Sequence, residues 1–124
     1  MPILHARDAR RHETPNAVMS TLASPSLGSA ELSVWRVVMT AGQRGPEHTF
    51  DVEQVWTVLD GAADVEINGE TYGVAPGDTL VLPSDAIRQI AAGHGGFEAL
   101  VAARAGARAA LADGTDKGTP AWIA

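Results

Sequence analysis

The chain has 124 residues, no cysteine, 9 basic and 15 acidic residues, and a formal net charge of −6. This length suits one domain with a modest core, and the missing cysteines exclude disulfides and thiolate metal sites. The acidic balance argues against nucleic acid as a partner, and no apolar run approaches the roughly 18 residues of a membrane span, so no membrane partner is expected.

The N-terminal segment, residues 1–29, is predicted to be an arm outside the main body of the fold. Its charged opening "MPILHARDARRHE" lacks the apolar region of a secretory signal, so we expect a cytoplasmic protein. "RDARRHE" indicates a solvated arm, with strand exchange between subunits as the alternative. "AVMSTLA" (17–23) is strand-forming, and we expect it to pair with the sheet of another subunit. The sheet edges of a small barrel need such cover, which predicts a homodimer.

Short runs rich in Val, Leu, Ile, Thr and Trp then alternate with turn-forming residues. This pattern predicts an all-β fold, an antiparallel barrel or jelly roll. Asn68-Gly69 is the strongest hairpin signal, because a two-residue turn needs positive φ at both positions. "LDG" (59–61) and "AGHGG" (92–96) are predicted to be turns. The predicted strands are 31–39, 47–59, 63–67, 70–74, 78–82, 86–90 and 97–103.

The C-terminal part, residues 104–124, is predicted to be a tail on a single domain that spans 1–124, with the barrel at about 30–103. A short helix is credible only in "AGARAALA" (105–112), where the alanine content favours one. Trp122 in "GTPAWIA" is expected either to dock on the barrel or to contact a second subunit.

Two spaced motifs carry most of the functional information. In the first, Gly42 is followed after five residues by His48, then by Phe50, by Gln54 after three residues, and by Gly61 after six.

The second motif has Gly77, Pro83 after five residues, Asp85, Arg88 after two more, and Ala92 after three. Together the motifs resemble those of the cupin family, Gly-x5-His-x-His-x3-Glu-x6-Gly and Gly-x5-Pro-x-Gly-x2-His-x3-Asn. The resemblance covers roughly residues 30–103 and implies an RmlC-like barrel of two antiparallel sheets with a ligand site in its mouth.

The resemblance also implies that the metal-binding side chains of the family are mostly missing. Of the four ligand positions only His48 is kept, while Phe50, Gln54 and Arg88 occupy the others. A divalent metal needs three or four N, O or S donors, and an arginine cation would repel it. No cofactor is therefore expected. Any divalent metal would depend on His48 and Gln54, with His94, His12 or His5 recruited as further ligands.

Each candidate residue has a structural and a functional interpretation. His48, Gln54 and Arg88 are the catalytic candidates, with His48 as a proton carrier and the other two as oxyanion partners. Arg88 is also expected to bind an anionic or carbonyl-containing small molecule, unless it pairs internally with a carboxylate such as Asp85. Three aromatic residues, expected mainly in the core, could also form an apolar wall for the ligand: Phe50, Trp56 and Trp35.

Three functions remain open at this stage. The first is a metal-independent enzyme, an isomerase, cyclase, dehydratase or decarboxylase acting on a small oxo compound. The resemblance supports it, because some cupins are metal-free sugar epimerases and others assist polyketide tailoring. The second is a non-catalytic binder or sensor of a small organic anion. The third is a metal-dependent oxygenase or isomerase with a rebuilt ligand set.

Overall fold

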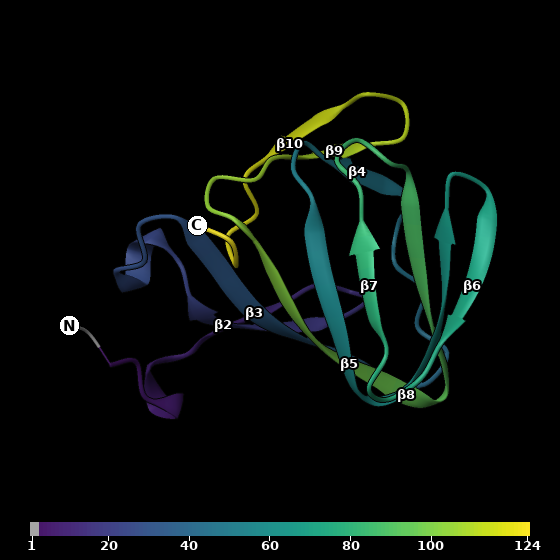
Figure 1. Ribbon diagram of the computed structural model, residues 1–124, viewed down its shortest axis with the longest axis horizontal. Coiled ribbons are helices and arrows are strands. Elements are labelled where there is room, and N and C mark those ends of the chain that lie inside the picture. The colour runs from purple at the N-terminus through teal and green to yellow at the C-terminus, as the bar shows by residue number, and fades with distance from the viewer. Residues whose placement is uncertain (1–2) are drawn as a thin grey trace.

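Antiparallel strands make up most of the computed structural model, which describes residues 3–124 (Figure 1). This confirms the all-β fold class. Two short 3-10 helices occur in this range, η1 (Ala6–Asp8) and η2 (Pro25–Leu27). The strands are β1 (Arg10–Glu13), β2 (Val18–Ala23), β3 (Leu32–Met39), β4 (His48–Phe50), β5 (Gln54–Ile67), β6 (Glu70–Val74), β7 (Thr79–Leu82), β8 (Arg88–Arg104), β9 (Ala109–Leu111) and β10 (Asp116–Gly118).

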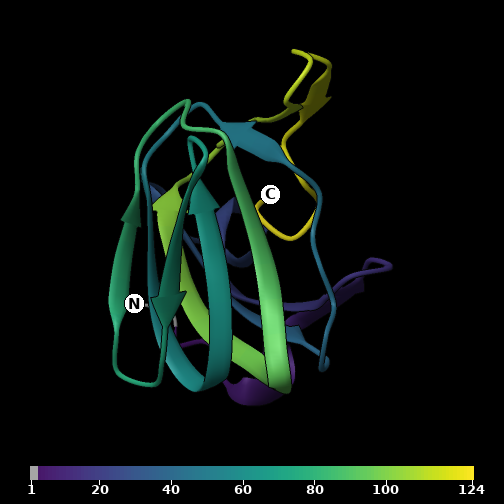
Figure 2. The same ribbon diagram turned by 90° about the vertical axis from the view of Figure 1, so that its right-hand side faces the viewer.

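The strands form one curled sheet whose two layers share the long strands β5 and β8. The order along the sheet is β1-β2-β3-β8-β4-β9-β10, and β5 pairs with β6, β7 and β8. The first part of β5 pairs with the last part of β8, and the last part of β5 pairs with the first part of β8. Figures 1 and 2 show both strands turning together at the lower edge, so that the sheet folds back on itself.

Glycines allow this turn inside the strands. Gly61 has a φ of +72°, and a Cβ added there would lie 2.1 Å from the carbonyl oxygen of Gly96. The register of β5 against β8 shifts on both sides of Gly61, as a bulge requires. Because the two backbones cross so closely, only glycine fits at this position.

The predicted turns at 59–61 and 92–96 are therefore wrong, since β5 and β8 continue through them. Glycine serves there for close approach of two backbones rather than for chain reversal. The Asn68-Gly69 hairpin is confirmed, with φ values of +47° and +87° joining β5 to β6. The predicted strand 47–59 is split, because residues 51–53 separate β4 from β5.

The helix expected within 105–112 is also wrong. Gly106 has a φ of +80°, and residues from Ala109 form β9, which pairs with β4. Pairing with a neighbouring strand overrides the weak helical preference of the alanines.

The segment 17–23 forms β2, as expected for a strand, but it pairs with β1 and β3 of its own chain. The pairing that we expected β2 to make with a second subunit is thus made within the same chain. Part of "RDARRHE" is likewise ordered as β1. The homodimer itself stays a prediction. No helix within residues 3–124 is long and apolar enough to cross a membrane.

The C-terminal tail docks on its own barrel. The Thr21 hydroxyl donates a hydrogen bond to the carbonyl of Trp122 at 2.6 Å, and the Ser33 hydroxyl donates one to the carbonyl of Ile123 at 2.6 Å. The side chain of Ile123 is fully buried. Of the two placements expected for Trp122, the structure shows docking on the barrel.

Candidate functional site

A cavity of about 600 Å³ opens into the curled sheet, between β2, β3, β4, β5 and the C-terminal segment. Most of its wall is apolar, with Met19, Met39, Ile90 and the three tryptophans of the chain among the lining residues. Another hollow, of about 440 Å³, lies on the outer side near Leu32 and Arg104, and none of the predicted site residues lines it. The inner cavity is therefore the candidate site.

Five of the predicted site residues line this cavity, namely His48, Gln54, Phe50, Trp56 and Trp35. Strand alternation explains this arrangement, because every second side chain of β3, β4 and β5 points to the same side of the sheet. Trp35 is 2% exposed and Trp56 stacks on Phe97 with ring centroids 6.3 Å apart. The tryptophans thus form a rigid apolar wall as well as part of the core.

His48 is held with a defined tautomer. Its Nδ1 lies 2.9 Å from the carbonyl oxygen of Pro46, which can only accept a hydrogen bond, so Nδ1 carries the proton. In the neutral ring Nε2 then keeps a lone pair. Burial lowers the pKa of His48 below its usual value, the Pro46 hydrogen bond opposes this, and the Arg88 charge adds to the lowering. His48 is therefore a neutral base near pH 7.

Gln54 is 1% exposed, and only one of the two polar atoms of its amide group is hydrogen-bonded. Its Oε1 accepts a hydrogen bond from the indole Nε1 of Trp56 at 3.0 Å. An indole nitrogen can only donate, so this contact fixes the orientation of the amide. The Nε2 of Gln54 is buried and has no hydrogen-bond partner among the described residues. Two N–H groups are thus left for a ligand.

Arg88 is 1% exposed but does not line the cavity. Its Nε donates to the carbonyl of Ala86 at 2.9 Å, and its Nη2 donates to the carbonyl of Pro83 at 2.8 Å. The guanidinium carbon lies over the ring of Phe50, 5.7 Å from the centroid. Phe50, rather than Arg88, thus presents its surface to the cavity.

Arg88 and His48 are nevertheless direct neighbours, because they are paired across β4 and β8. The internal ion pair considered for Arg88 is not seen within residues 3–124, since no carboxylate lies within 4.0 Å of it. Its partners are backbone carbonyls of the loop before β8. These two bonds support a structural role for Arg88, whereas its Nη1 is buried without a hydrogen-bond partner among the described residues. The role of Arg88 toward an anionic ligand stays a prediction.

The residues present do not fit a metal centre of the kind found in the family. Within the described residues, no group of three or more His, Asp or Glu side chains could hold an ion. Gln54 already uses its oxygen toward Trp56, and Arg88 brings a cation to the fourth position. His94 and His5 are exposed, and neither they nor His12 line the cavity.

The sequence allowed Trp122 to dock on the barrel, but it did not predict that the C-terminal segment lines the cavity. The β9–β10 hairpin and the tail supply part of the wall, including Lys117, Pro120 and Trp122. Their only signals in the sequence are that Lys117 is the single lysine and that Trp122 lies near the end of the chain. Both lie outside the two motifs, so spacing could not place them.

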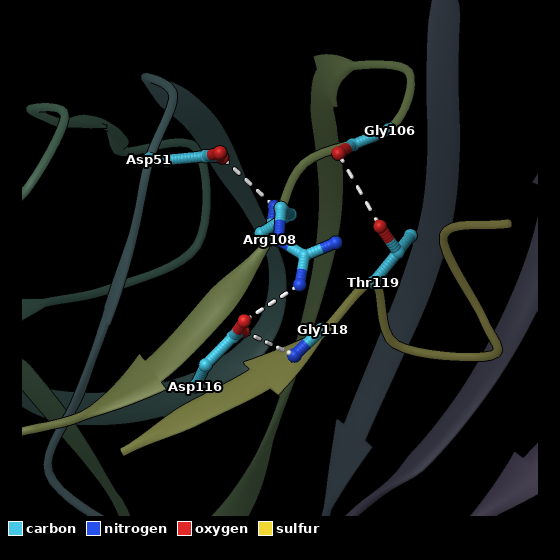
Figure 3. A network of polar contacts seen from close by, with 6 residues as sticks. All are labelled: Asp51, Gly106, Arg108, Asp116, Gly118 and Thr119. Atoms are coloured by element: carbon cyan, nitrogen blue, oxygen red, sulfur yellow. Dashed lines mark hydrogen bonds and ion pairs between the residues drawn. The ribbon is translucent and has the colours of Figure 1, made fainter. Parts of the chain in front are cut away.

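Polar contacts fix this hairpin against the loop after β4 (Figure 3). Asp51 accepts a hydrogen bond from the backbone N–H of Arg108 at 2.8 Å. The Arg108 guanidinium donates to Asp116 at 2.6 Å and holds the pKa of that carboxyl below its usual value. The Thr119 hydroxyl donates to the carbonyl of Gly106 at 3.3 Å. One wall of the cavity is thus anchored by exposed polar groups.

Comparison with solved structures shows the same fold in several proteins. KdgF from Halomonas sp. matches with a TM-score of 0.72 and 20% identity over 84% of this chain and 93% of that chain. The polyketide cyclase RemF from Streptomyces resistomycificus matches with a TM-score of 0.72 and 21% identity, over 84% of this chain and 79% of that one. An RmlC-like cupin from Shewanella frigidimarina matches with a TM-score of 0.70 and 16% identity, over 81% of this chain and 86% of that one.

A search of the curated proteins finds no significant match. The family model described as "Cupin domain" matches residues 35–101, which include both motifs in full and the strands β4 to β7. This agrees with the motif spacing, with the curled antiparallel sheet and with the solved structures. The chain belongs to the cupin family.

Proposed function

We propose that the protein binds a small, largely apolar carbonyl compound in the inner cavity and moves a proton on it, with His48 as the base and Gln54 as the carbonyl partner. The observation that carries this proposal is the buried amide nitrogen of Gln54, which has no partner among the described residues. A buried N–H group without a partner costs about 1–3 kcal/mol. A ligand oxygen would remove that cost, and it would fix the ligand's orientation in an otherwise apolar space.

His48 supports a proton-transfer step. Its Nε2 has no hydrogen bond within residues 3–124, and its Nδ1 proton is fixed on Pro46. Nε2 would take the proton from the carbon next to the carbonyl, and the electrons of that C–H bond would form the C=C bond of an enolate. The enolate oxygen would accept from Gln54, and return of the proton to carbon would restore the ketone and the neutral ring.

This step accounts for the small number of polar groups in the cavity. Enolisation needs one base and one oxyanion partner, and it underlies isomerisation, cyclisation and dehydration of oxo compounds alike. The likeness to a polyketide cyclase, at 21% identity, shows a shared fold and does not identify the substrate. A non-catalytic binder is the second candidate, because His48 is the one histidine among the lining residues and no carboxylate accompanies it.

The test uses 2-tetralone, a bicyclic ketone with exchangeable protons next to its carbonyl. Its binding is followed by tryptophan fluorescence, since all three tryptophans line the cavity, and its proton exchange is followed by NMR in deuterium oxide. We expect binding and accelerated exchange. His48→Gln should lower the exchange rate by about 10²–10⁴-fold and leave affinity within threefold. Gln54→Leu should weaken binding by about 2–10-fold.

Gln43→Leu is the matched control, because Gln43 lies outside the cavity and should change neither reading. Binding without exchange in the wild-type protein would favour the binder. Wild-type exchange that persists in His48→Gln would refute the assigned base. An unchanged affinity in Gln54→Leu would refute the carbonyl site.

A further inference from the structure

The cavity wall has an unusual charge. The chain has 15 acidic residues, yet none of the residues that line the inner cavity is an Asp or a Glu. The one lining residue with a permanent charge is Lys117, which is also the only lysine in the chain. In a protein with a net charge of −6, Lys117 is thus the one cation on the cavity wall, and Arg88 lies behind that wall, covered by Phe50.

Lys117 stands at the rim rather than in the depth of the cavity. It lies on β10 and is exposed, whereas Gln54 and Trp35 are buried in the sheet. Among the described residues, Lys117 has no carboxylate within ion-pair distance. The adjacent carboxylate, Asp116, is occupied by Arg108 and by the backbone of Gly118 (Figure 3). A second carboxylate, Asp113, is near enough for the Lys117 charge to lower its pKa, but it lies beyond ion-pair distance and accepts a hydrogen bond from the backbone N–H of Thr115. The ammonium group is therefore left for a group that enters the cavity.

From depth to rim the wall thus offers an amide donor, aromatic faces and a cation. We propose that the natural ligand is an amphipathic organic anion, whose ring body lies against the tryptophans and whose carboxylate or similar anionic group is bound by Lys117. This inference rests on the proposed function, which gives the ligand its ring and its carbonyl group. What it adds is that the ligand carries a negative charge. It also moves the anion site from Arg88, which the sequence indicates, to the C-terminal hairpin.

The size of the effect follows from the exposure of Lys117. An exposed ion pair contributes about 0.2–1 kcal/mol, and a partly desolvated one contributes more. We therefore expect the affinity for an anionic ligand to fall threefold to tenfold when the charge of Lys117 is removed. Because the rim is open to solvent, salt should screen most of that share.

Two fluorescent probes with the same aromatic body separate charge from packing. 8-Anilinonaphthalene-1-sulfonate carries an anionic group, and N-phenyl-1-naphthylamine lacks it. Energy transfer from the tryptophans reports binding inside the cavity. The variants are Lys117→Gln, Lys117→Arg and, as a control with the same loss of charge, Arg104→Gln on the outer side of the sheet.

We expect Lys117→Gln to lower the affinity for the sulfonate probe threefold to tenfold. The affinity for the neutral probe should stay within twofold of the wild-type value. Lys117→Arg should keep the wild-type affinity, Arg104→Gln should change neither probe, and 0.5 M NaCl should reduce the loss. An equal loss of affinity for both probes, or no loss of affinity for the sulfonate probe, would overturn the role of Lys117. Either result would leave the cavity as the binding site. Failure of both probes to bind the wild-type protein would overturn the proposed ligand site as well.

Discussion

Replacing Arg88 with methionine tests whether this cation supports the fold or binds a ligand. The change keeps the apolar stem and removes two hydrogen bonds to the carbonyls of Ala86 and Pro83. Such charge-assisted bonds contribute about 1.5–3 kcal/mol each. Burial lowers the pKa of Arg88 from 12.5 to about 10, which corresponds to about 3 kcal/mol against the charged form. The two bonds together contribute about 3–6 kcal/mol, so the balance is a loss of up to about 3 kcal/mol in the free energy of unfolding.

For a chain of this size that loss lowers Tm by up to roughly 12 °C. Thermal unfolding followed by circular dichroism measures it, with Arg104→Met as an exposed control that should shift Tm by less than 2 °C. The affinity for 8-anilinonaphthalene-1-sulfonate should change less than threefold, because Phe50 separates the guanidinium from the cavity. A loss of affinity of tenfold or more with an unchanged Tm would refute this reasoning and restore Arg88 as the anion site.

Four further predictions use the same methods. Burial places the pKa of folded His48 below its unfolded value of 6.5, so stability should fall as the pH drops below about 6.5, and His48→Gln should flatten that dependence of Tm on pH. Gly61→Ala should cost at least about 2 kcal/mol, because its Cβ would collide with the carbonyl of Gly96; a neutral result would contradict the bulge. Thr21→Val should lower Tm by roughly 4–8 °C and weaken both naphthyl probes, because it releases the carbonyl of Trp122 from the barrel; tail docking is wrong if neither changes. Because β1 ends the sheet and its outer edge has no strand partner among the described residues, light scattering at micromolar concentration should show a homodimer, which a monomer would disprove.

A part of the fold could be predicted from the sequence where neighbouring residues alone determine the backbone conformation. Asn68-Gly69 requires positive φ for reasons contained in the two residues themselves, and the hairpin followed. Gly61 and Gly96 are different, because the need for glycine comes from a backbone crossing between segments far apart in the chain. A local pattern cannot distinguish that crossing from a turn.

The candidate site could be predicted to the extent that the motifs cover it. The resemblance to the cupin motifs predicted that His48 and Gln54 lie together in the barrel, and the structure has both on the wall of the inner cavity. It predicted the same for Arg88, but spacing carries no information on which neighbour, here Phe50, covers an inward side chain. Lys117 and Trp122 join the wall through the docking of the hairpin and tail, which depends on tertiary contacts alone.

The sharing of β5 and β8 by both layers has a consequence for how the protein folds and diverges. Residues near 54–58 pair with residues near 99–103, so neither layer can form before these distant segments meet, and folding should be slow and cooperative. The β9–β10 hairpin and the tail line the cavity but take no part in the pairing of β5 with β8. We therefore expect mutations in these segments to reshape the cavity with little effect on that pairing. New ligand preferences should therefore evolve most readily at the C-terminal end of the chain.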